Sequence, residues 1–192
     1  MAEVENAAGA GEPATGDAAR LRSLLEIAKV VGAVGRFDDL VELTAEEARR
    51  ALDAASLSIS RWDRESGTLR TLVNVGLLGP GEVRFPTDEV YSVSQWPHAM
   101  RLVDDRQGNV AVADDADGDN EQARLLVGLG KDSSIATPIV VEARVWGELY
   151  ATRTASQSRF TTAELDFANA VATQVAAGVV QADHFARIER LA

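Results

Sequence analysis

The sequence predicts an α+β domain in which β-hairpins are enclosed by helices at the two ends of the chain. Apolar residues recur at three- and four-residue steps near both ends, which is the period of amphipathic helices. Between these ends the period drops to two in two separate segments, as expected for half-buried strands joined by turns. With 192 residues, the chain is long enough for one hydrophobic core with appendages.

The composition argues against several classes of function. The formal net charge is −11, and Lys29 and Lys131 are the only lysines, so no basic stripe is available for a nucleic-acid backbone or an anionic membrane. The chain has no cysteine, and no apolar run approaches the ~20 residues of a membrane-spanning helix. We therefore expect a cytoplasmic protein that binds neither nucleic acid nor a membrane directly.

The N-terminal region divides into a tail and two helices. Residues 1–19 lack apolar periodicity and are expected to be disordered, and the folded domain is expected to span residues 20–180. A first helix is predicted to begin at Leu21, with the inner residues Leu21, Leu24, Leu25, Ala28, Val31 and Gly32. A second helix follows Asp38, with the inner residues Leu40, Val41, Thr44, Ala48, Ala51 and Leu52.

Two hairpins and a long connection follow these helices. The segments ASLSISRW and TLRTLVNVG alternate with a period of two and predict the first hairpin. The connection begins at GPG and contains short helices near residues 99–105 and 121–129, with the strand NVAVAD between them. The segments SSIATPIVV and VWGELYATR predict a second hairpin, in which Trp146, Glu148 and Tyr150 share one face.

A long helix closes the chain. Thr161 or Thr162 can cap it, and Glu164 lies three residues after Thr161, which is the spacing of a capping box. No proline interrupts the following sequence up to Ala192, and a helix of this length extends roughly 45 Å. Because a compact domain of this size cannot cover such a length, we expect residues 181–192 to protrude.

The order of these elements, read with the closing stretch ATPIVVEARVWGELYATRTASQSRFTTAELDFANAVATQVAAGVV, resembles the GAF family of small-molecule sensor domains. The resemblance covers about residues 21–185. The residues that carry it most specifically are Pro138, Gly147, Leu149, Arg159, Phe160 and Thr161. We expect Gly147 to permit the close approach of a packed helix, and Phe160 to hold the final helix onto the sheet.

The resemblance implies a particular architecture. It is an antiparallel sheet of about six strands, with the N- and C-terminal helices on one face and short helices and loops over a ligand pocket on the other, as in GAF and PAS domains. The pocket wall would come from residues 79–130, and the candidate ligand-binding residues are Tyr91, Trp96, His98, Arg101, Asp114, Asp115 and Arg124. Aromatic side chains offer a stacking surface and charges orient a ligand. The alternative is that Tyr91 and Trp96 only fill the space above the sheet.

The sequence indicates no catalytic residue and no metal site, so we do not expect an enzyme. The acidic loop DDADGDNEQ fits part of a calcium-binding loop, but Ala113 and Arg124 would occupy two of the ligand positions. Some related sensors hold haem through a histidine near the position of His98, although a structural histidine is the commoner case. A bilin is normally attached through a cysteine, and there is none. The ligand and any cofactor stay open.

The final helix is also predicted to mediate dimerisation. Val175, Ala182, Phe185 and Ile188 recur close to the heptad rhythm of a coiled coil. Since the domain ends near residue 181, the expected partner is the same helix of a second subunit, giving a homodimer. The alternative is an exposed end that frays.

The last residues, ARIERLA, resemble the linker that enters a GGDEF diguanylate cyclase domain in GAF-containing bacterial signalling proteins. The same linker also suits ANTAR, histidine-kinase, HD-type phosphodiesterase and phosphatase outputs. We therefore expect a bacterial sensor domain that reports its ligand to an output domain following residue 192, with cyclic di-GMP synthesis as one candidate output. The rival interpretations are a ligand-free dimerisation module and a small enzyme that uses free carboxylates.

Overall fold

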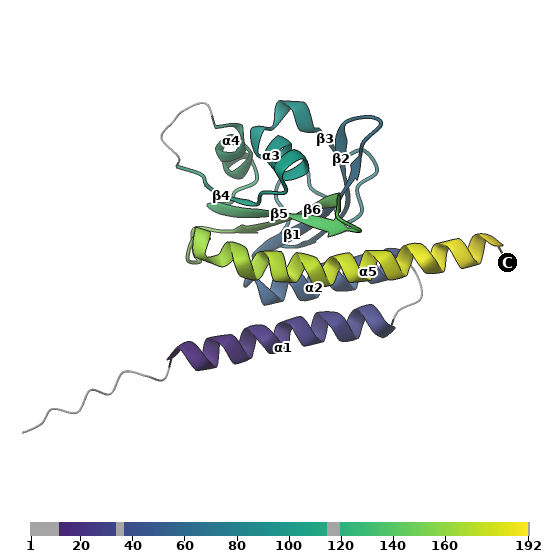
Figure 1. Cartoon of the computed structure of the whole chain (residues 1–192). Coiled ribbons are helices and arrows are strands. Elements are labelled where there is room, and N and C mark those ends of the chain that lie inside the picture. The colour runs from purple at the N-terminus through teal and green to yellow at the C-terminus, as the bar shows by residue number, and fades with distance from the viewer. Residues whose placement is uncertain (1–11, 34–36, 115–119, 192) are drawn as a thin grey trace, which may run out of the picture.

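A six-stranded antiparallel sheet forms the centre of the molecule, with helices on both of its faces (Figure 1). The structure is a computed structural model that describes residues 12–33, 37–114 and 120–191. The strands, in spatial order, are β3 (Val90–Ser92), β2 (Thr68–Gly76), β1 (Ser56–Asp63), β6 (Arg144–Arg153), β5 (Ser133–Val141) and β4 (Asn109–Val112). The predicted α+β class and the sheet of about six strands are confirmed. The sequence analysis did not place β3, which lies in the long connection.

Helices cover both faces of the sheet, as the resemblance implied (Figure 1). On one face lie α1 (Glu12–Ala33), α2 (Phe37–Ala51) and α5 (Leu165–Leu191), whereas α3 (Pro97–Asp105) and α4 (Glu121–Gly128) lie on the other (Figure 1). On the first face, α1 packs on the outer side of α2 and α5 (Figure 1). Two short 3-10 helices, η1 (Val93–Gln95) and η2 (Thr162–Glu164), precede α3 and α5. The Asn120 side chain caps α4 by accepting a hydrogen bond from the Gln122 backbone N–H at 3.0 Å.

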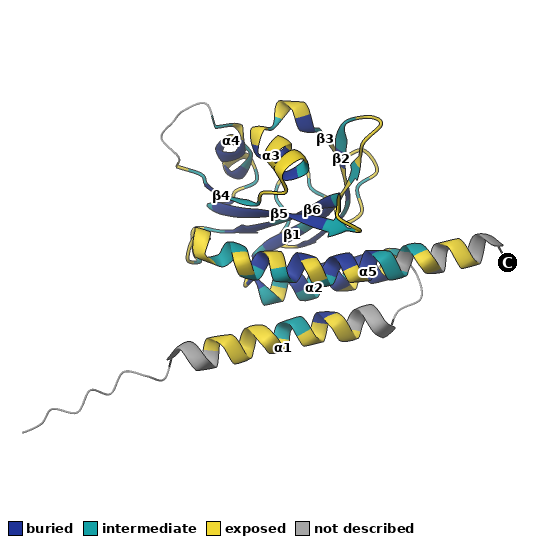
Figure 2. Cartoon of the chain, in the orientation of Figure 1, coloured by how far each residue is buried: buried dark blue, intermediate teal, exposed yellow. Residues whose placement is uncertain are grey.

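The central strands β1 and β6 separate two chemically different faces. Leu57 and Ile59 of β1, with Leu149 and Ala151 of β6, lie in the main core against α2 and α5. Their sequence neighbours point to the other face because successive strand residues alternate in direction. The main core therefore lies between the sheet and the helices α2 and α5, whereas smaller apolar clusters lie on the side of α3, and buried residues occur on both sides of the sheet (Figure 2).

Helix α1 differs from its prediction in start and orientation. It begins at Glu12, so residues 12–19, which were expected to be disordered, are helical. Proline is tolerated in a first helical turn, and the alanines that follow Pro13 favour helix. Ile27 is fully buried, whereas Leu21 and Leu25 are 60% and 54% exposed, so the predicted inner face was partly wrong. The α1 helix packs on α2 and α5, and the side chains of Leu21 and Leu25 remain exposed among charged residues.

The start of α5 is fixed by a group of polar and aromatic contacts. The Glu164 carboxylate accepts a hydrogen bond from the Thr161 backbone N–H at 2.8 Å, which confirms the predicted contact of a capping box. Arg153, at the end of β6, donates to Glu164 at 3.0 Å and to the Leu52 carbonyl at 2.7 Å. Phe160 is buried beneath the Arg153 guanidinium, which lies 3.9 Å from the centre of its ring. The final helix is therefore tied to β6 and to the end of α2.

Gly147 is required by the sheet and not by a helix, which corrects our expectation. A Cβ atom at this position would lie 2.0 Å from the Ser60 carbonyl oxygen of β1. Gly147 pairs with Arg61 in the ladder between β1 and β6, next to a register shift between Ile59 and Ser60. The irregular strand brings backbone atoms too close for any side chain.

Candidate functional site

A small, partly enclosed space, here called the hollow, lies between the sheet and the layer formed by α3 and α4. Its floor is built from β1, β2 and β6, and its walls come from α3, α4 and the segment between β2 and α3. The space measures about 40 Å³, enough for on the order of three water molecules. The predicted wall, residues 79–130, supplies part of this lining.

The floor of the hollow is polar, although it lies in the middle of the sheet. Register places Glu148 opposite Ser60, and Ser60 opposite Thr71, in one row across β6, β1 and β2. A second row contains Tyr150, Ser58 and Asn74. The Ser58 hydroxyl donates to the Asn74 side-chain oxygen at 2.6 Å. A buried polar patch costs stability unless its groups form hydrogen bonds. The hydrogen-bond partners of each group therefore show which groups the fold itself leaves unpaired.

Three polar side chains converge on Glu89. Its carboxylate accepts hydrogen bonds from the Thr71 hydroxyl at 2.9 Å, the Asn74 amide at 2.8 Å and the Tyr91 hydroxyl at 3.1 Å. Glu89 also holds the edge of the sheet, because the Thr71 N–H donates to its backbone carbonyl at 3.0 Å. One end of the hollow is thus a carboxylate with three side-chain donors.

Glu148, at the other end of the floor, is different. Its side chain is 9% exposed, and its Oε1 atom has no hydrogen-bond partner among the described residues. The Nε2 atom of His98 lies 3.8 Å from Oε1, which is beyond hydrogen-bond distance. Burial raises the pKa of Glu148 to about 7. The site therefore contains a carboxyl group that changes its charge near neutral pH.

The predicted residues Tyr91, Trp96 and His98 line the hollow together. Trp96 makes edge-on contacts with both neighbours, at ring-centroid distances of 6.0 Å to Tyr91 and 5.8 Å to His98. Trp96 and Tyr91 also pack against a small apolar cluster of Leu69, Val93 and Ala99, so they fill space as well as lining the hollow. Burial, with a smaller effect of Arg101, lowers the pKa of His98 to about 4, which keeps this ring neutral at pH 7.

Arg101 and Arg124 are placed in an adjoining groove and not in the hollow. This groove is open, measures about 710 Å³, and shares Trp96 and His98 with the hollow. Arg124 lies 3.8 Å from Glu121 on the same helix. The two arginines belong to the rim beside the hollow because α3 and α4 turn them outward.

Asp114, a predicted ligand-binding residue, does not line the hollow. It follows β4 at the sheet edge and forms an ion pair with Arg159 at 2.8 Å, and Arg159 also binds Asp132 at 2.6 Å. These contacts raise the pKa of Arg159 above its ordinary value. Asp114 and Asp132 therefore hold Arg159 in the segment before α5. Asp115 lies outside the described residues.

The residues predicted for a dimer seam fall into two groups. Val175 is fully buried in the core of its own subunit, so its assignment to the seam is wrong. Ile188 is 63% exposed near the end of α5, where the helix extends past the sheet (Figure 1). The backbone positions of Ala182 and Phe185 lie on α5, but their side chains are outside the described part of the structure.

Sequence reasoning missed the residues that shape the hollow floor, namely Ser58, Ser60, Thr71, Glu89, Glu148 and Tyr150. A sequence pattern could have indicated some of them. Serine alternates with leucine and isoleucine along β1, and a glutamate stands in the centre of the apolar segment VWGELYA. Polar residues at inward positions of central strands indicate a polar interior on that face.

The described residues place no group of three or more His, Cys, Asp or Glu side chains where they could hold a metal ion. Over the same residues, no helix is long and apolar enough to cross a membrane. The chain has no cysteine to attach a bilin, and the hollow is far smaller than a tetrapyrrole. The hollow therefore does not fit either a bilin or a haem, and we assign no chemistry to such a group.

Comparisons with known proteins identify the class of domain. The model of the GAF domain family matches residues 36–179. Over 54 residues the chain is 43% identical to an uncharacterized protein in the hutH 5' region of Streptomyces griseus, and this match spans 28% of the chain and 22% of that protein. The chain belongs to the GAF domain family.

Solved structures show the same fold at low sequence identity. The GAF domain of a phosphoenolpyruvate-protein phosphotransferase from Coxiella burnetii has a TM-score of 0.70 at 17% identity, covering 88% of this chain and 98% of that chain. A phycocyanobilin-bound GAF domain from a cyanobacterial phytochrome has a TM-score of 0.68 at 17% identity, covering 86% and 96%. The free methionine-R-sulfoxide reductase from Neisseria meningitidis has a TM-score of 0.66 at 16% identity, covering 96% and 99%.

Proposed function

We propose that this GAF domain binds a small molecule in the hollow and transmits the bound state to an output domain through α5. The observation that carries the proposal is Glu148, a buried carboxyl group with an unpaired oxygen on the floor of a lined space. Stable folding alone gives no reason to keep such a group, because an unsatisfied buried polar atom costs free energy.

The architecture offers a direct route from the hollow to α5. Glu148 and Tyr150 of β6 face the hollow, while Leu149 between them packs in the core that includes Val171 and Val175 of α5. A ligand that shifts β6 therefore changes the surface on which α5 rests. Coupling requires that the ligand bind one arrangement better than the other.

The second half of the proposal is a homodimer. Leu21 and Leu25 of α1 and Ile188 of α5 expose apolar surface on the helix layer, and the distal part of α5 extends beyond the rest of the domain (Figures 1 and 2). Pairing of these helices between two subunits would bury that surface. The output that follows is proposed to be a diguanylate cyclase domain or another of the outputs that such a linker suits.

The main alternative is a dimerisation module that binds no ligand. The small volume of the hollow, about 40 Å³, favours this alternative, because most ligand pockets are several times larger. A ligand larger than a few atoms would require α3 or α4 to move away from the sheet.

Ligand binding in the hollow can be tested by the fluorescence of Trp96, once the emission of the other tryptophans, Trp62 and Trp146, is removed. A variant with Trp62→Phe and Trp146→Phe should respond to a bound metabolite by a change in emission that accompanies a rise in melting temperature. The control replaces Trp96 as well, and it should keep the thermal shift but lose the emission change.

Metabolites and nucleotides are screened with both readouts. A compound that raises the melting temperature without changing Trp96 emission would show that the ligand site lies outside the hollow. A screen in which neither quantity changes would support the ligand-free module. Native mass spectrometry of freshly purified protein adds an independent check for a bound small molecule.

A further inference from the structure

We propose that the ligand of the hollow is a small organic cation, a protonated primary amine whose ammonium group contacts Glu148. This inference rests on the proposed function and names its ligand class. Three features of the hollow carry it: an unpaired buried carboxyl oxygen, further carboxylates in the lining, and aromatic walls.

The unpaired oxygen defines the position of the ligand's donor. Glu148 Oε1 is buried, faces the hollow and has no hydrogen-bond partner among the described residues. The Nε2 atom of His98 is 3.8 Å away, and the neutral His98 ring does not supply a charge. A carboxylate accepts hydrogen bonds only, so the group that completes it must be a donor, and a charged donor forms the stronger bond.

The other charged side chains that line the hollow are also acidic. Glu82 and Glu89 also line the hollow, and Glu89 lies at the β2 side, where it contacts Thr71 and Asn74. The basic side chains near it are turned to other partners: Lys131 donates to the Leu77 carbonyl, and Arg101 and Arg124 line the adjoining groove. An anionic ligand would meet three acidic side chains without a basic group in the lining, whereas a cation is attracted by all three.

The aromatic walls distinguish an organic cation from a metal ion. Tyr91, Trp96 and Tyr150 line the same space, and aromatic rings attract organic cations through their faces. The described residues contain no group of three or more metal-ligand side chains. The volume of about 40 Å³ suits a compact ammonium group with a short carbon chain.

The experiment compares three ligands of equal length that differ in charge, namely 1-propylamine, 1-propanol and propionate. Binding is measured by Trp96 emission in the Trp62→Phe, Trp146→Phe protein and by thermal shift, at millimolar concentrations because so small a ligand binds weakly. Ionic strength is held constant with sodium chloride, since the net charge of −11 attracts any cation non-specifically.

We expect 1-propylamine to bind, and 1-propanol and propionate to have no effect. Glu148→Gln keeps the size of the side chain but removes its charge, and it should weaken 1-propylamine binding by roughly tenfold or more. The matched control is Glu65→Gln, which makes the same change in the exposed turn between β1 and β2 and should leave binding unchanged.

The pH dependence gives a second readout. The pKa of Glu148 is about 7, so its carboxylate form, which attracts an ammonium group, becomes dominant above that pH. The affinity for 1-propylamine should therefore rise between pH 6 and pH 8. The other groups that face Glu148 are His98 from α3, Tyr150 from β6, and Glu82 and Glu89 from the segment before β3. Of these, His98 is neutral over this range.

Other outcomes would overturn the cation proposal. Three results would contradict the cation proposal but still show a ligand site: equal binding of 1-propanol, preferential binding of propionate, and 1-propylamine binding that is unchanged in Glu148→Gln. If 1-propylamine does not bind but another metabolite changes Trp96 emission, the sensor function stands and the ligand class is wrong. If neither the amine nor a broader screen has an effect, both proposals fail.

Discussion

At the scale of single residues, Glu148 is the most informative side chain of the molecule. It occupies a central position of β6, pairs in register with Ser60 of β1, and keeps an unpaired buried oxygen. Replacing such a group by an uncharged one of similar shape is expected to stabilise a protein that has no ligand. Because Glu148 lowers the stability of the ligand-free protein, we infer that it is kept for ligand binding and not for folding.

The cost should depend on pH in a defined direction. Burial raises the pKa of Glu148 to about 7 from an ordinary value of 4.5. Below pH 4.5 the side chain is protonated in both the folded and the unfolded chain and carries no penalty. As pH rises toward 7 only the unfolded chain ionises, so the folded state loses stability, and the loss is complete above pH 7.

We therefore predict that Glu148→Gln raises the free energy of unfolding at pH 8 by up to about 3 kcal/mol. The gain should become small near pH 4.5, and it can be measured by urea denaturation across this range. His98 is present in both proteins, so its own titration cancels in the comparison. Glu65→Gln serves as the control and should show no such trend. A Glu148→Gln protein that is less stable at pH 8 would mean that the carboxyl group has a structural partner.

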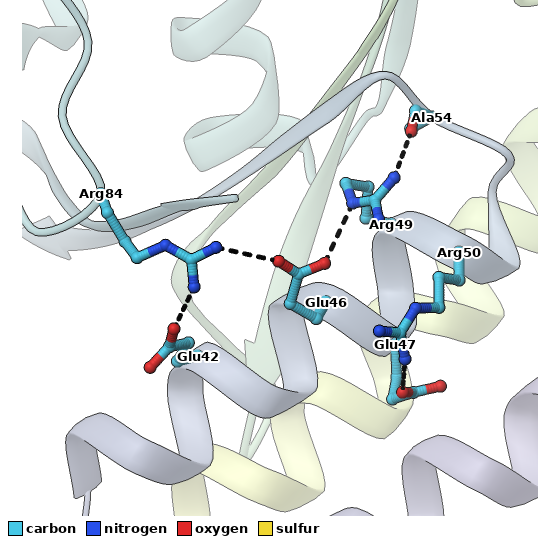
Figure 3. A network of polar contacts seen from close by, with 7 residues as sticks. All are labelled: Glu42, Glu46, Glu47, Arg49, Arg50, Ala54 and Arg84. Carbon is cyan, nitrogen blue, oxygen red and sulfur yellow. Dashed lines mark hydrogen bonds and ion pairs between the residues drawn. The ribbon is translucent and has the colours of Figure 1, made fainter. Parts of the chain in front are cut away.

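At the scale of elements, the segment between β2 and β3 connects the hollow to the helix layer. It contributes Glu82 and Glu89 to the lining. Between them, Arg84 reaches α2 and binds Glu42 and Glu46, with a distance of 3.1 Å to Glu46 (Figure 3). Glu46 also binds Arg49, which donates to the Ala54 carbonyl in the turn before β1 (Figure 3). One network thus joins a wall of the hollow, α2 and the sheet.

Arg84→Ala should loosen this segment without unfolding the domain. The side chain is partly exposed, and exposed ion pairs contribute little to global stability. Amide hydrogen exchange in residues 77–89 is therefore expected to become faster, while the thermal midpoint changes little. The matched control is Arg50→Ala, because Arg50 pairs only within α2, with Glu47, in the same view (Figure 3). Unchanged exchange in residues 77–89 would show that Arg84 does not restrain the segment.

At the scale of the whole molecule, the two faces of the sheet differ in the side chains that they bury. The helices α2 and α5 cover one side and α3 and α4 the other (Figure 1). The first side buries the main apolar core. The second contains two smaller apolar clusters and the hollow with its polar floor. The final helix belongs to the first side, yet its far end leaves the domain. In the proposed function, ligand binding in the hollow on one side would be transmitted to the protruding end of α5 on the other.

The proposed dimer is tested by the double variant Phe185→Glu and Ile188→Glu. If the ends of α5 pair, these charges should separate the subunits, and light scattering should give the mass of a monomer. Arg187→Glu is the control, because helical spacing places Arg187 on the opposite side of the helix from Phe185. It should leave the mass unchanged. A parent protein that is already monomeric, or a double variant with the mass of a dimer, would contradict the proposed pairing.

The sequence by itself determined the elements of the fold and the family. Periodicities of three to four and of two are local consequences of backbone geometry, so the second and final helices, both hairpins and the capping residues Thr161 and Glu164 could be located without coordinates. The start of α1 was misplaced because helix propensity at residues 12–19 is not accompanied by apolar periodicity. Tyr91, Trp96 and His98 were recognised as wall residues because the order of elements already places their segment over the sheet.

Only the tertiary structure decided which polar residues meet. The hollow brings together residues that are distant in sequence, namely Ser60, Thr71, Glu89 and Glu148. The register of β2, β1 and β6 aligns three of them, and the segment between β2 and β3 places Glu89 beside Thr71. In the same way, Val175 belongs to the core and Asp114 to an ion pair at the sheet edge, although spacing and proximity in sequence suggested otherwise. Periodicity reports which residues share a face, whereas burial and pairing depend on what the rest of the chain places against that face.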